Sequence, residues 1–398
     1  MALEQPRKSS TMLLALLLLF GAAAVAVESG LVRCVRPELS MCYCGKTAYD
    51  RQDLYVVNCT DTSLSTAKSL EVFGNLPAEV EVFIFTGNYL TELPSNIFGT
   101  NSTIDKLRYL DMSNNSIKLI KGKSYHHVSA VERLVLNNNQ IDLGELGYHH
   151  PRVFSNFNNL YELHLTNAFA DTDTINITTN LYEVFLNSNL SNLVKLHLEH
   201  NKISIITEPR VFCRLPSMLD LHLSNNELTG INFNIECLSR LRFLDLENNK
   251  IQTLPEKQLS ALDRVHHNNQ SLAIDLSNNR FLCGCAIENI YSWLRTTRVN
   301  VRNNETIRCT IGEKNPLDPF AAYHTECPSP VRTTLVDSNH GGHKLVAVFV
   351  FCAVIAFLGA VVYVSRFGLK RLRSEFNTSS RKIHYTTIGR GEEQEIHV

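Results

Sequence analysis

The chain repeats one arrangement of apolar and polar positions eight times between Val80 and Phe281. In a representative copy, Leu241, Leu244 and Leu246 occupy positions 1, 4 and 6, and Asn249 occupies position 9. The alternation around positions 3 to 7 predicts a short strand, because successive side chains of a strand point to opposite faces. One copy cannot bury its apolar face, so we expect the copies to stack and share one core.

The residues at position 9 give the spacing of the repeats. They are separated by 27, 24, 29, 33, 25, 23 and 30 residues and are Asn88, Asn115, Asn139, Ala168, Asn201, Asn226, Asn249 and Asn279. Most intervals lie within the ~20–29 residues typical of leucine-rich repeats, in which this asparagine bonds to the backbone of neighbouring turns. The expected fold is therefore an α/β leucine-rich repeat solenoid over residues 77–281, a horseshoe with a parallel β-sheet.

Two features predict local departures from this regular stack. The intervals of 33 and 30 residues indicate inserted loops. The fourth copy has Ala168 instead of asparagine, and the polar run Asp171–Thr174 follows it. We expect an irregular turn there rather than a break in the solenoid.

Cysteines flank the repeats in two sets of four. Disulfides can stabilise the caps that must cover the two ends of a solenoid. We therefore predict an N-terminal cap at 27–76 with Cys34, Cys42, Cys44 and Cys59, and a C-terminal cap at 282–328 with Cys283, Cys285, Cys309 and Cys327. Four cysteines allow three pairings, and the C-x-C spacing also fits a zinc site, which an oxidising compartment disfavours.

A further pair, Cys213 and Cys237, lies within the repeats. Cys213 precedes Leu221 by eight residues, and Cys237 precedes Leu244 by seven. The two cysteines therefore occupy nearly equivalent places in adjacent coils, which predicts a disulfide between them.

Two apolar segments predict a single-pass type I protein of the plasma membrane, with its N-terminus outside the cell. Residues 1–26 have the pattern of a signal peptide. Residues 345–365 carry no charge over 21 positions, enough for a transmembrane helix, and basic residues follow them. A short stalk at 329–344 would precede this helix, and 366–398 would be a cytoplasmic tail. The ectodomain carries 28 Lys and Arg against 34 Asp and Glu over 28–343, which argues against nucleic acid as a partner.

The proposed extracellular part contains seven N-x-S/T sequons, which predict a glycoprotein. They begin at Asn58, Asn101, Asn114, Asn176, Asn189, Asn269 and Asn304.

Side chains at positions 3, 5 and 7 of each repeat should point away from the core, onto the concave face of the sheet. Position 5 is histidine in three consecutive repeats, at His164, His197 and His222. Strands about 4.8 Å apart would place these rings in a column, although an irregular fourth repeat would move His164 out of it. We favour a polar binding face, and keep pH-sensitive binding and a zinc site as alternatives.

No motif of nucleophilic, metalloprotease or nucleotide-dependent catalysis occurs in the sequence, so we expect no enzyme and no cofactor. The C-terminus offers Ile396 and Val398, an apolar-x-apolar end that fits a PDZ-domain ligand. Tyr385 lies in a pattern typical of a sorting signal or a phosphorylation site.

Several stretches together resemble the vertebrate trophoblast glycoprotein family. They are Asn75–Val80 with Phe85–Asn88, the cap motif Phe281–Cys285 with Trp293 and Leu294, the single predicted span, and the basic run from Arg366 to Arg371. The resemblance implies cap disulfides between the first and third and the second and fourth cysteines: Cys34–Cys44, Cys42–Cys59, Cys283–Cys309 and Cys285–Cys327.

The same resemblance implies a cell-surface protein that restrains Wnt signalling through its N-terminal repeats. Ile84 matches an apolar residue of the family's functional patch, and Asn58 stands where the family has a basic residue. We therefore expect a protein ligand or co-receptor to contact the concave residues Ile84, Tyr109, Asp111, Arg133, His164, His197 and His222. An adhesion or synapse-organising protein coupled to a PDZ scaffold is the alternative.

Overall fold

The computed structural model describes residues 30–100, 104–143, 152–170, 176–267, 270–283, 287–310, 353–359 and 361–363. The chain forms two compact units, Met1–Cys327 and Pro328–Val398. The described part of the second unit is helical, and no helix among the described residues is both long and apolar enough to cross a membrane. The predicted signal peptide, stalk and tail lie outside the described residues.

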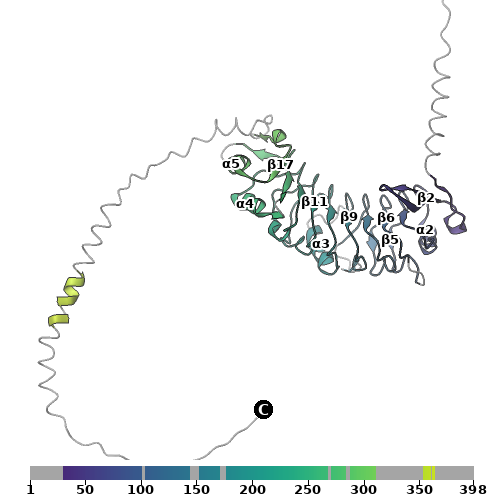
Figure 1. Cartoon of the computed structure of the whole chain (residues 1–398), viewed down its shortest axis with the longest axis horizontal. Coiled ribbons are helices and arrows are strands. Elements are labelled where there is room, and N and C mark those ends of the chain that lie inside the picture. Colours follow the sequence, from purple (N-terminus) through teal and green to yellow (C-terminus); the bar gives the residue numbers. More distant parts are fainter. Residues whose placement is uncertain are drawn as a thin grey trace, which may run out of the picture. The chain divides into compact units, whose positions relative to one another are not determined.

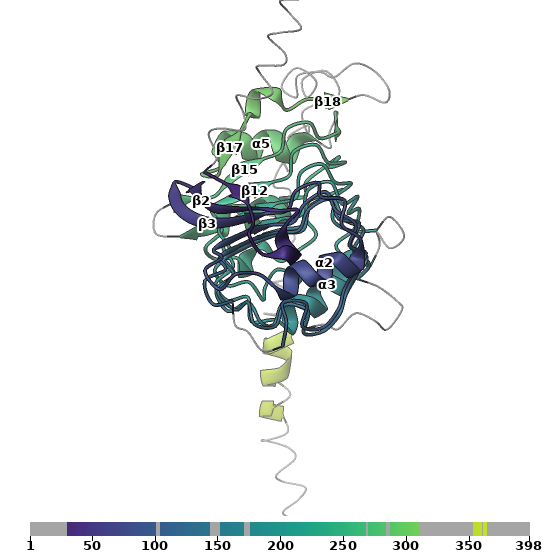
Figure 2. The same cartoon turned by 90° about the vertical axis from the view of Figure 1, so that its right-hand side faces the viewer.

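The first unit is a solenoid whose eight repeats each contribute one three-residue strand. These strands are β4 (Val82–Ile84), β6 (Tyr109–Asp111), β8 (Arg133–Val135), β9 (Glu162–His164), β10 (Lys195–His197), β11 (Asp220–His222), β12 (Phe243–Asp245) and β15 (Ala273–Asp275). They lie side by side in this order and pair in parallel, as the repeat pattern predicts (Figure 1). Viewed along the stack, successive coils overlie one another, with α2 and α3 away from the sheet (Figure 2).

The sheet extends beyond the repeats at both ends. On the N-terminal side β1 (Val32–Arg33), β2 (Tyr43–Tyr49) and β3 (Gln52–Asn58) pair antiparallel, and β3 then pairs in parallel with β4. On the C-terminal side β17 (Asn300–Arg302) pairs in parallel with β15. The result is one 12-stranded sheet that runs from cap to cap.

Asparagines at position 9 connect each coil to the one before it. Asn226 shows the pattern: its Nδ2 donates to Leu198 O at 2.9 Å and to Leu223 O at 3.0 Å. Its Oδ1 accepts from the backbone N–H groups of Asn201 and Ile203, both at 3.0 Å. The buried side chain thus satisfies four backbone groups that the tight turn would leave without partners.

Position 8 requires left-handed backbone in every repeat. Its φ lies between 49° and 68° at Gly87, Asn114, Asn138, Asn167, His200, Asn225, Asn248 and Asn278. Asparagine tolerates this region better than most residues, which explains the run of Asn–Asn pairs. At Gly87 a Cβ would lie 1.9 Å from Asp61 Oδ1, so a larger residue there would require the Asp61 side chain to move.

The solenoid continues through the irregular fourth repeat, as predicted. Ala168 has no side-chain amide, and the Ile141 N–H donates instead to Ala168 O at 2.8 Å. Ile141 and Phe169 also form an isolated parallel bridge. Backbone pairing therefore takes over the connection that the asparagine makes elsewhere. The run Asp171–Thr174 lies outside the described residues.

The two long intervals contain helices rather than only loops. The first holds α3 (Ile177–Leu186), which buries Ile177, Leu181, Val184 and Phe185. The second holds α4 (Glu256–Arg264) and the short hairpin of β13 (His266–His267) and β14 (Gln270–Ser271). Apolar residues spaced by four and three positions are the signal that favours a helix in both intervals.

The remaining elements close the ends of the core or connect the coils. Phe73 of α2 (Thr66–Gly74) packs against Phe83, Phe85 and Phe98 at centroid distances of 4.9–5.3 Å. At the other end α5 (Glu288–Thr296) buries Ile290 and Trp293. The short connecting elements are η1 (Pro37–Leu39), β5 (Glu92–Leu93), β7 (Leu119–Ile120), η3 (Ile235–Cys237), β16 (Phe281–Leu282), η5 (Asn304–Thr306) and β18 (Cys309–Thr310).

In the part of the chain that the structure describes, four disulfides connect residues within the caps and within one pair of coils. The bonds are Cys34–Cys44, Cys42–Cys59, Cys213–Cys237 and Cys283–Cys309. The three cap bonds have the partners that the family resemblance implies. Cys285 and Cys327 lie outside the described residues.

We expect Asn226→Ala to lower the free energy of unfolding by roughly 2–4 kcal/mol, because buried backbone groups lose their partners. The matched control is Asn192→Ala, an exposed asparagine whose Nδ2 bonds to Asn158 O at 2.8 Å. That change should stay within about 0.5 kcal/mol. Chemical denaturation of both variants measures the difference, and equal losses would contradict a structural role of the position-9 ladder.

Candidate partner-binding face

The concave face, formed by the side chains at positions 3, 5 and 7, is an ordered surface that is polar from the fourth repeat onward. In each repeat strand the middle residue points into the core, and its two neighbours are placed on this face. Because the parallel strands pair in register, equivalent positions of successive repeats lie next to each other. The face can therefore be described as rows of side chains that cross the strands.

The most regular row is the histidine stack of His164, His197 and His222. The rings of His164 and His197 have centroids 4.1 Å apart, and those of His197 and His222 are 4.2 Å apart. Both pairs have an interplanar angle of 7°, so the rings are parallel. The expected displacement of His164 is wrong, because the backbone pairing around Ala168 keeps β9 in register with β10.

Carboxylates line the stack and bond to it. The Nδ1 of His197 lies 2.8 Å from Glu199 Oε1, and the second oxygen of Glu199 accepts a hydrogen bond from Thr166 Oγ1 at 2.6 Å. The Nδ1 of His222 lies 3.6 Å from Asp245 Oδ2 and 3.9 Å from Glu199 Oε1. The two imidazoles and the two carboxylates are each about four-fifths or more buried.

Burial and these contacts set the charge of the stack. Burial lowers the pKa of His197 below its ordinary value, and the two flanking histidines act in the same direction against the bond to Glu199. Burial alone would raise the pKa of Glu199, but hydrogen bonds from His197 and Thr166 outweigh it and lower this pKa to about 2. At neutral pH a neutral His197 therefore bonds to an ionised Glu199.

Glu162 is the centre of an ion-pair cluster at the first histidine. Its carboxylate contacts Arg133 Nε, Lys195 Nζ at 2.7 Å and His164 Nε2 at 3.5 Å. Burial alone would raise the pKa of Glu162, but these three neighbours hold it well below its usual range. Arg133 is thus fixed between Glu162 and Asp50, and much of its charge is already compensated.

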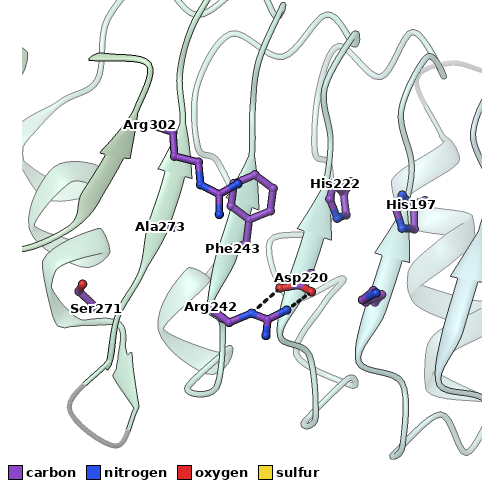
Figure 3. Close-up of a pocket in the computed structure, with 9 residues that line it drawn as sticks. His197, Asp220, His222, Arg242, Phe243, Ser271, Ala273 and Arg302 are labelled. Atoms are coloured by element: carbon purple, nitrogen blue, oxygen red, sulfur yellow. Dashed lines mark hydrogen bonds and ion pairs between the residues drawn. The ribbon is translucent and has the colours of Figure 1, made fainter. Parts of the chain in front are cut away.

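Ring contacts extend from the histidines toward the C-terminal cap through Phe243, a position-3 residue that pairs with Asp220 in the neighbouring strand. The ring of Phe243 lies edge-on to His222 with centroids 5.4 Å apart, and the guanidinium of Arg302 lies 4.2 Å above the Phe243 ring. Beside it, Arg242 bonds to both carboxylate oxygens of Asp220, at 3.0 and 2.5 Å. An open cavity of about 750 Å³ is lined by Lys195, His197, Asp220, His222, Arg242, Phe243, Ser271, Ala273 and Arg302 (Figure 3).

At the N-terminal end of the face, Tyr109 is not available as a contact residue. Its side chain is only 7% exposed because Tyr49, from the end of β2, packs against it with centroids 5.2 Å apart. Arg108 and Arg133 add guanidinium groups about 5 Å from the same ring. Ile84, which is partly exposed, packs at the edge of this cluster.

The other predicted residues fall in different places. Asp111 is partly exposed and bonds to the Ser113 backbone N–H and hydroxyl, at 2.9 and 2.6 Å. The sequon residues Asn114, Asn176, Asn189 and Asn304 are exposed, and Asn58 is partly exposed. Asn101, Asn269, Ile396 and Val398 lie outside the described residues.

Two side chains of this face, Tyr49 and Arg302, lie outside the repeat pattern. Tyr49 belongs to a hairpin of the cap. This hairpin folds back over the repeats and brings together residues that lie far apart in the sequence. Arg302 stands in β17, after the last repeat. The alternation of Asn300, Val301 and Arg302, with only Val301 directed to the core, is the signal that could have extended the sheet by one strand.

We expect the loss of stability on acidification to be smaller in His197→Gln than in the wild type. The folded chain binds the His197 proton more weakly than the unfolded chain. The contribution of neutral His197 to the free energy of unfolding is therefore complete above the ordinary histidine pKa of about 6.5, and it declines as the pH falls below this value. Denaturation curves between about pH 7.5 and pH 5, with chelator present, measure the decline.

The control for this prediction is His200→Asn, at an exposed position 8 where asparagine suits the left-handed backbone. It should leave the pH dependence unchanged. The same loss of stability with falling pH in His197→Gln and in the wild type would contradict the role assigned to His197.

Comparison with known proteins shows which proteins this chain resembles. A family model described as Leucine Rich Repeat matches residues 106–124 and 240–262. Trophoblast glycoprotein of Macaca fascicularis is 26% identical over 355 residues, which cover 83% of this chain and 76% of that protein. The Mus musculus protein of the same name is 25% identical and covers 79% and 74%. Lumican of Homo sapiens is 25% identical over 54% of this chain and 66% of its own.

A solved structure has the same fold. The crystal structure of human 5T4, also named Wnt-activated inhibitory factor 1 and trophoblast glycoprotein, superposes with a TM-score of 0.59 at 24% identity. The match covers 71% of this chain and 98% of that one. Together with the repeats, the caps and the sequence similarity over most of the chain, this makes the protein a trophoblast glycoprotein-like leucine-rich repeat protein.

Proposed function

We propose that this protein is a non-enzymatic cell-surface glycoprotein that binds an extracellular protein through its concave face and inhibits Wnt-type signalling. In this proposal residues 345–365 anchor it as a single-pass type I membrane protein. The observation that carries the proposal is the structural likeness to human 5T4, which bears the name Wnt-activated inhibitory factor 1, over 98% of that chain.

The N-terminal end of the solenoid has a surface suited to protein binding. Ile84 is partly exposed on β4, and the strand register places it in one row with Asn58 and with Tyr43, which is 43% exposed. Exposed apolar side chains beside polar ones are typical of protein-binding surfaces. Tyr109 has a different role, because its buried ring supports the hairpin that bears Tyr49.

Asn58 stands where the family has a basic residue, and this gives the surface a different chemistry. Asn58 and Ile84 are direct partners in the pairing of β3 with β4. Asn58 Oδ1 accepts hydrogen bonds from the N–H and hydroxyl of Thr60, at 2.9 and 2.6 Å. The partner of this protein would therefore meet an amide, or a glycan on it, where the family offers a positive charge.

We expect Ile84→Asp to abolish inhibition of a β-catenin reporter at matched surface expression, because a carboxylate replaces an apolar contact. The control is Ile205→Asp, the same substitution at an isoleucine that is 52% exposed in the connection after β10. It should inhibit as the wild type does. Full inhibition by Ile84→Asp would count against this surface, and a wild type that leaves the reporter unchanged would count against the Wnt role.

An adhesion protein coupled to a PDZ scaffold is the second candidate, favoured by the C-terminal pair Ile396 and Val398. Deletion of residues 396–398 distinguishes the two functions. If adhesion is the function, cell–cell clustering should be lost because the scaffold no longer binds the tail. If the ectodomain acts on signalling, the reporter effect should persist and clustering should not depend on the deletion.

A further inference from the structure

Three potential metal ligands converge at the middle of the histidine stack. One ligand atom each from His197, Glu199 and His222 lie within 4.8 Å of one another. His197 and His222 are direct partners in the pairing of β10 with β11, and Glu199 follows His197 by two residues. The backbone of two adjacent coils therefore sets their relative positions before any ligand binds.

The distances suit a small divalent cation. Zinc bound at about 2.0–2.2 Å by nitrogen and oxygen in tetrahedral geometry places its ligands roughly 3.3–3.5 Å apart. Here Glu199 Oε1 lies 2.8 Å from His197 Nδ1 and 3.9 Å from His222 Nδ1, on either side of that value. Because a metal ion lies in the plane of each imidazole that binds it, the parallel rings of His197 and His222 must turn toward each other to share one ion, and this rotation would also equalise the two distances.

Neighbouring groups hold the three ligands in place. Thr166 Oγ1 donates to the second oxygen of Glu199 at 2.6 Å, which leaves Oε1 directed at the histidines. Phe243 packs edge-on against His222, and the bond to Glu199 positions His197. Such supporting contacts are typical of metal sites, where they fix the orientation of each ligand.

The charge of the surroundings also favours a cation. Asp245 lies 3.6 Å from His222 Nδ1, so two carboxylates border the imidazole nitrogens. The basic side chains of the adjacent rows, Lys195 and Arg242, are paired with Glu162 and Asp220. A cation between the imidazoles would therefore lie next to two carboxylates.

We propose that His197, Glu199 and His222 form a zinc-binding site on the concave face, with water completing the coordination. Two imidazoles and one carboxylate suit Zn²⁺, whereas Ca²⁺ and Mg²⁺ prefer oxygen ligands alone. The site connects two adjacent coils, so bound zinc would stabilise the solenoid as well as change the charge of the binding face. It is independent of the proposed signalling role.

Titration of the full-length protein with Zn²⁺ tests this site. The protein should carry no histidine tag and should be freed of metal by a chelator that is then removed. Isothermal calorimetry at neutral pH should show one Zn²⁺ per chain and no comparable binding of Ca²⁺. Both Glu199→Gln and His222→Gln should weaken Zn²⁺ binding by at least about tenfold.

His164→Gln is the matched control, because this histidine belongs to the same stack but directs its Nε2 at Glu162. It should bind Zn²⁺ as the wild type does. Zinc should also raise the unfolding temperature of the wild type and of His164→Gln, but not of the two ligand variants. Since Glu199→Gln keeps the size of the side chain and its bond to Thr166, it serves as the variant whose fold is least disturbed.

The proposal is overturned by the absence of one-to-one Zn²⁺ binding, or by binding that Glu199→Gln and His222→Gln leave intact. Equal loss in His164→Gln would also overturn it, because the stack as a whole and not the three named ligands would then be responsible.

Discussion

The whole structure depends on how a tight turn satisfies its backbone hydrogen bonds. A three-residue strand followed by a left-handed residue cannot pair its own N–H and C=O groups, so each coil requires its neighbour. The position-9 asparagine meets this need from within the core, as the four bonds of Asn226 show. Stability is therefore shared between adjacent coils, and the two ends need caps because no further coil covers them.

The same constraint produces the concave face. Because the turns hold every strand in register, residues at one position of the repeat form a straight row. The histidine rings are parallel within 7° because position 5 recurs one strand apart, and Phe243 of the neighbouring position-3 row connects them to Arg302. Parallel rings about 4 Å apart would repel if all were protonated, so the geometry and the lowered pKa of His197 agree. A binding surface of this kind is ordered before a partner arrives.

Local pattern was sufficient to predict the strands, since Leu, Asn and alternation recur within each repeat. It was also sufficient for Cys213–Cys237, whose cysteines stand at equivalent places of adjacent coils. It failed where contacts join distant parts of the chain. The burial of Tyr109 depends on Tyr49, 60 residues earlier and on another element. His164 was expected to shift because the backbone bond from Ile141 to Ala168 O has no side-chain signature in the sequence.

The two ends of the concave face differ in chemistry, which limits what can bind where. The N-terminal end combines Ile84 with Tyr43 of the cap, and its arginines are already engaged with Tyr109 and with carboxylates. The C-terminal end presents imidazoles, carboxylates and the stacked guanidinium of Arg302 around an open cavity. A partner that covers both ends must therefore bury apolar surface at one and supply polar or charged groups at the other. Buried area alone does not determine affinity, so the two ends can contribute differently to binding. The apolar end is suited to supply most of the binding energy, and the polar end is suited to determine which partner fits.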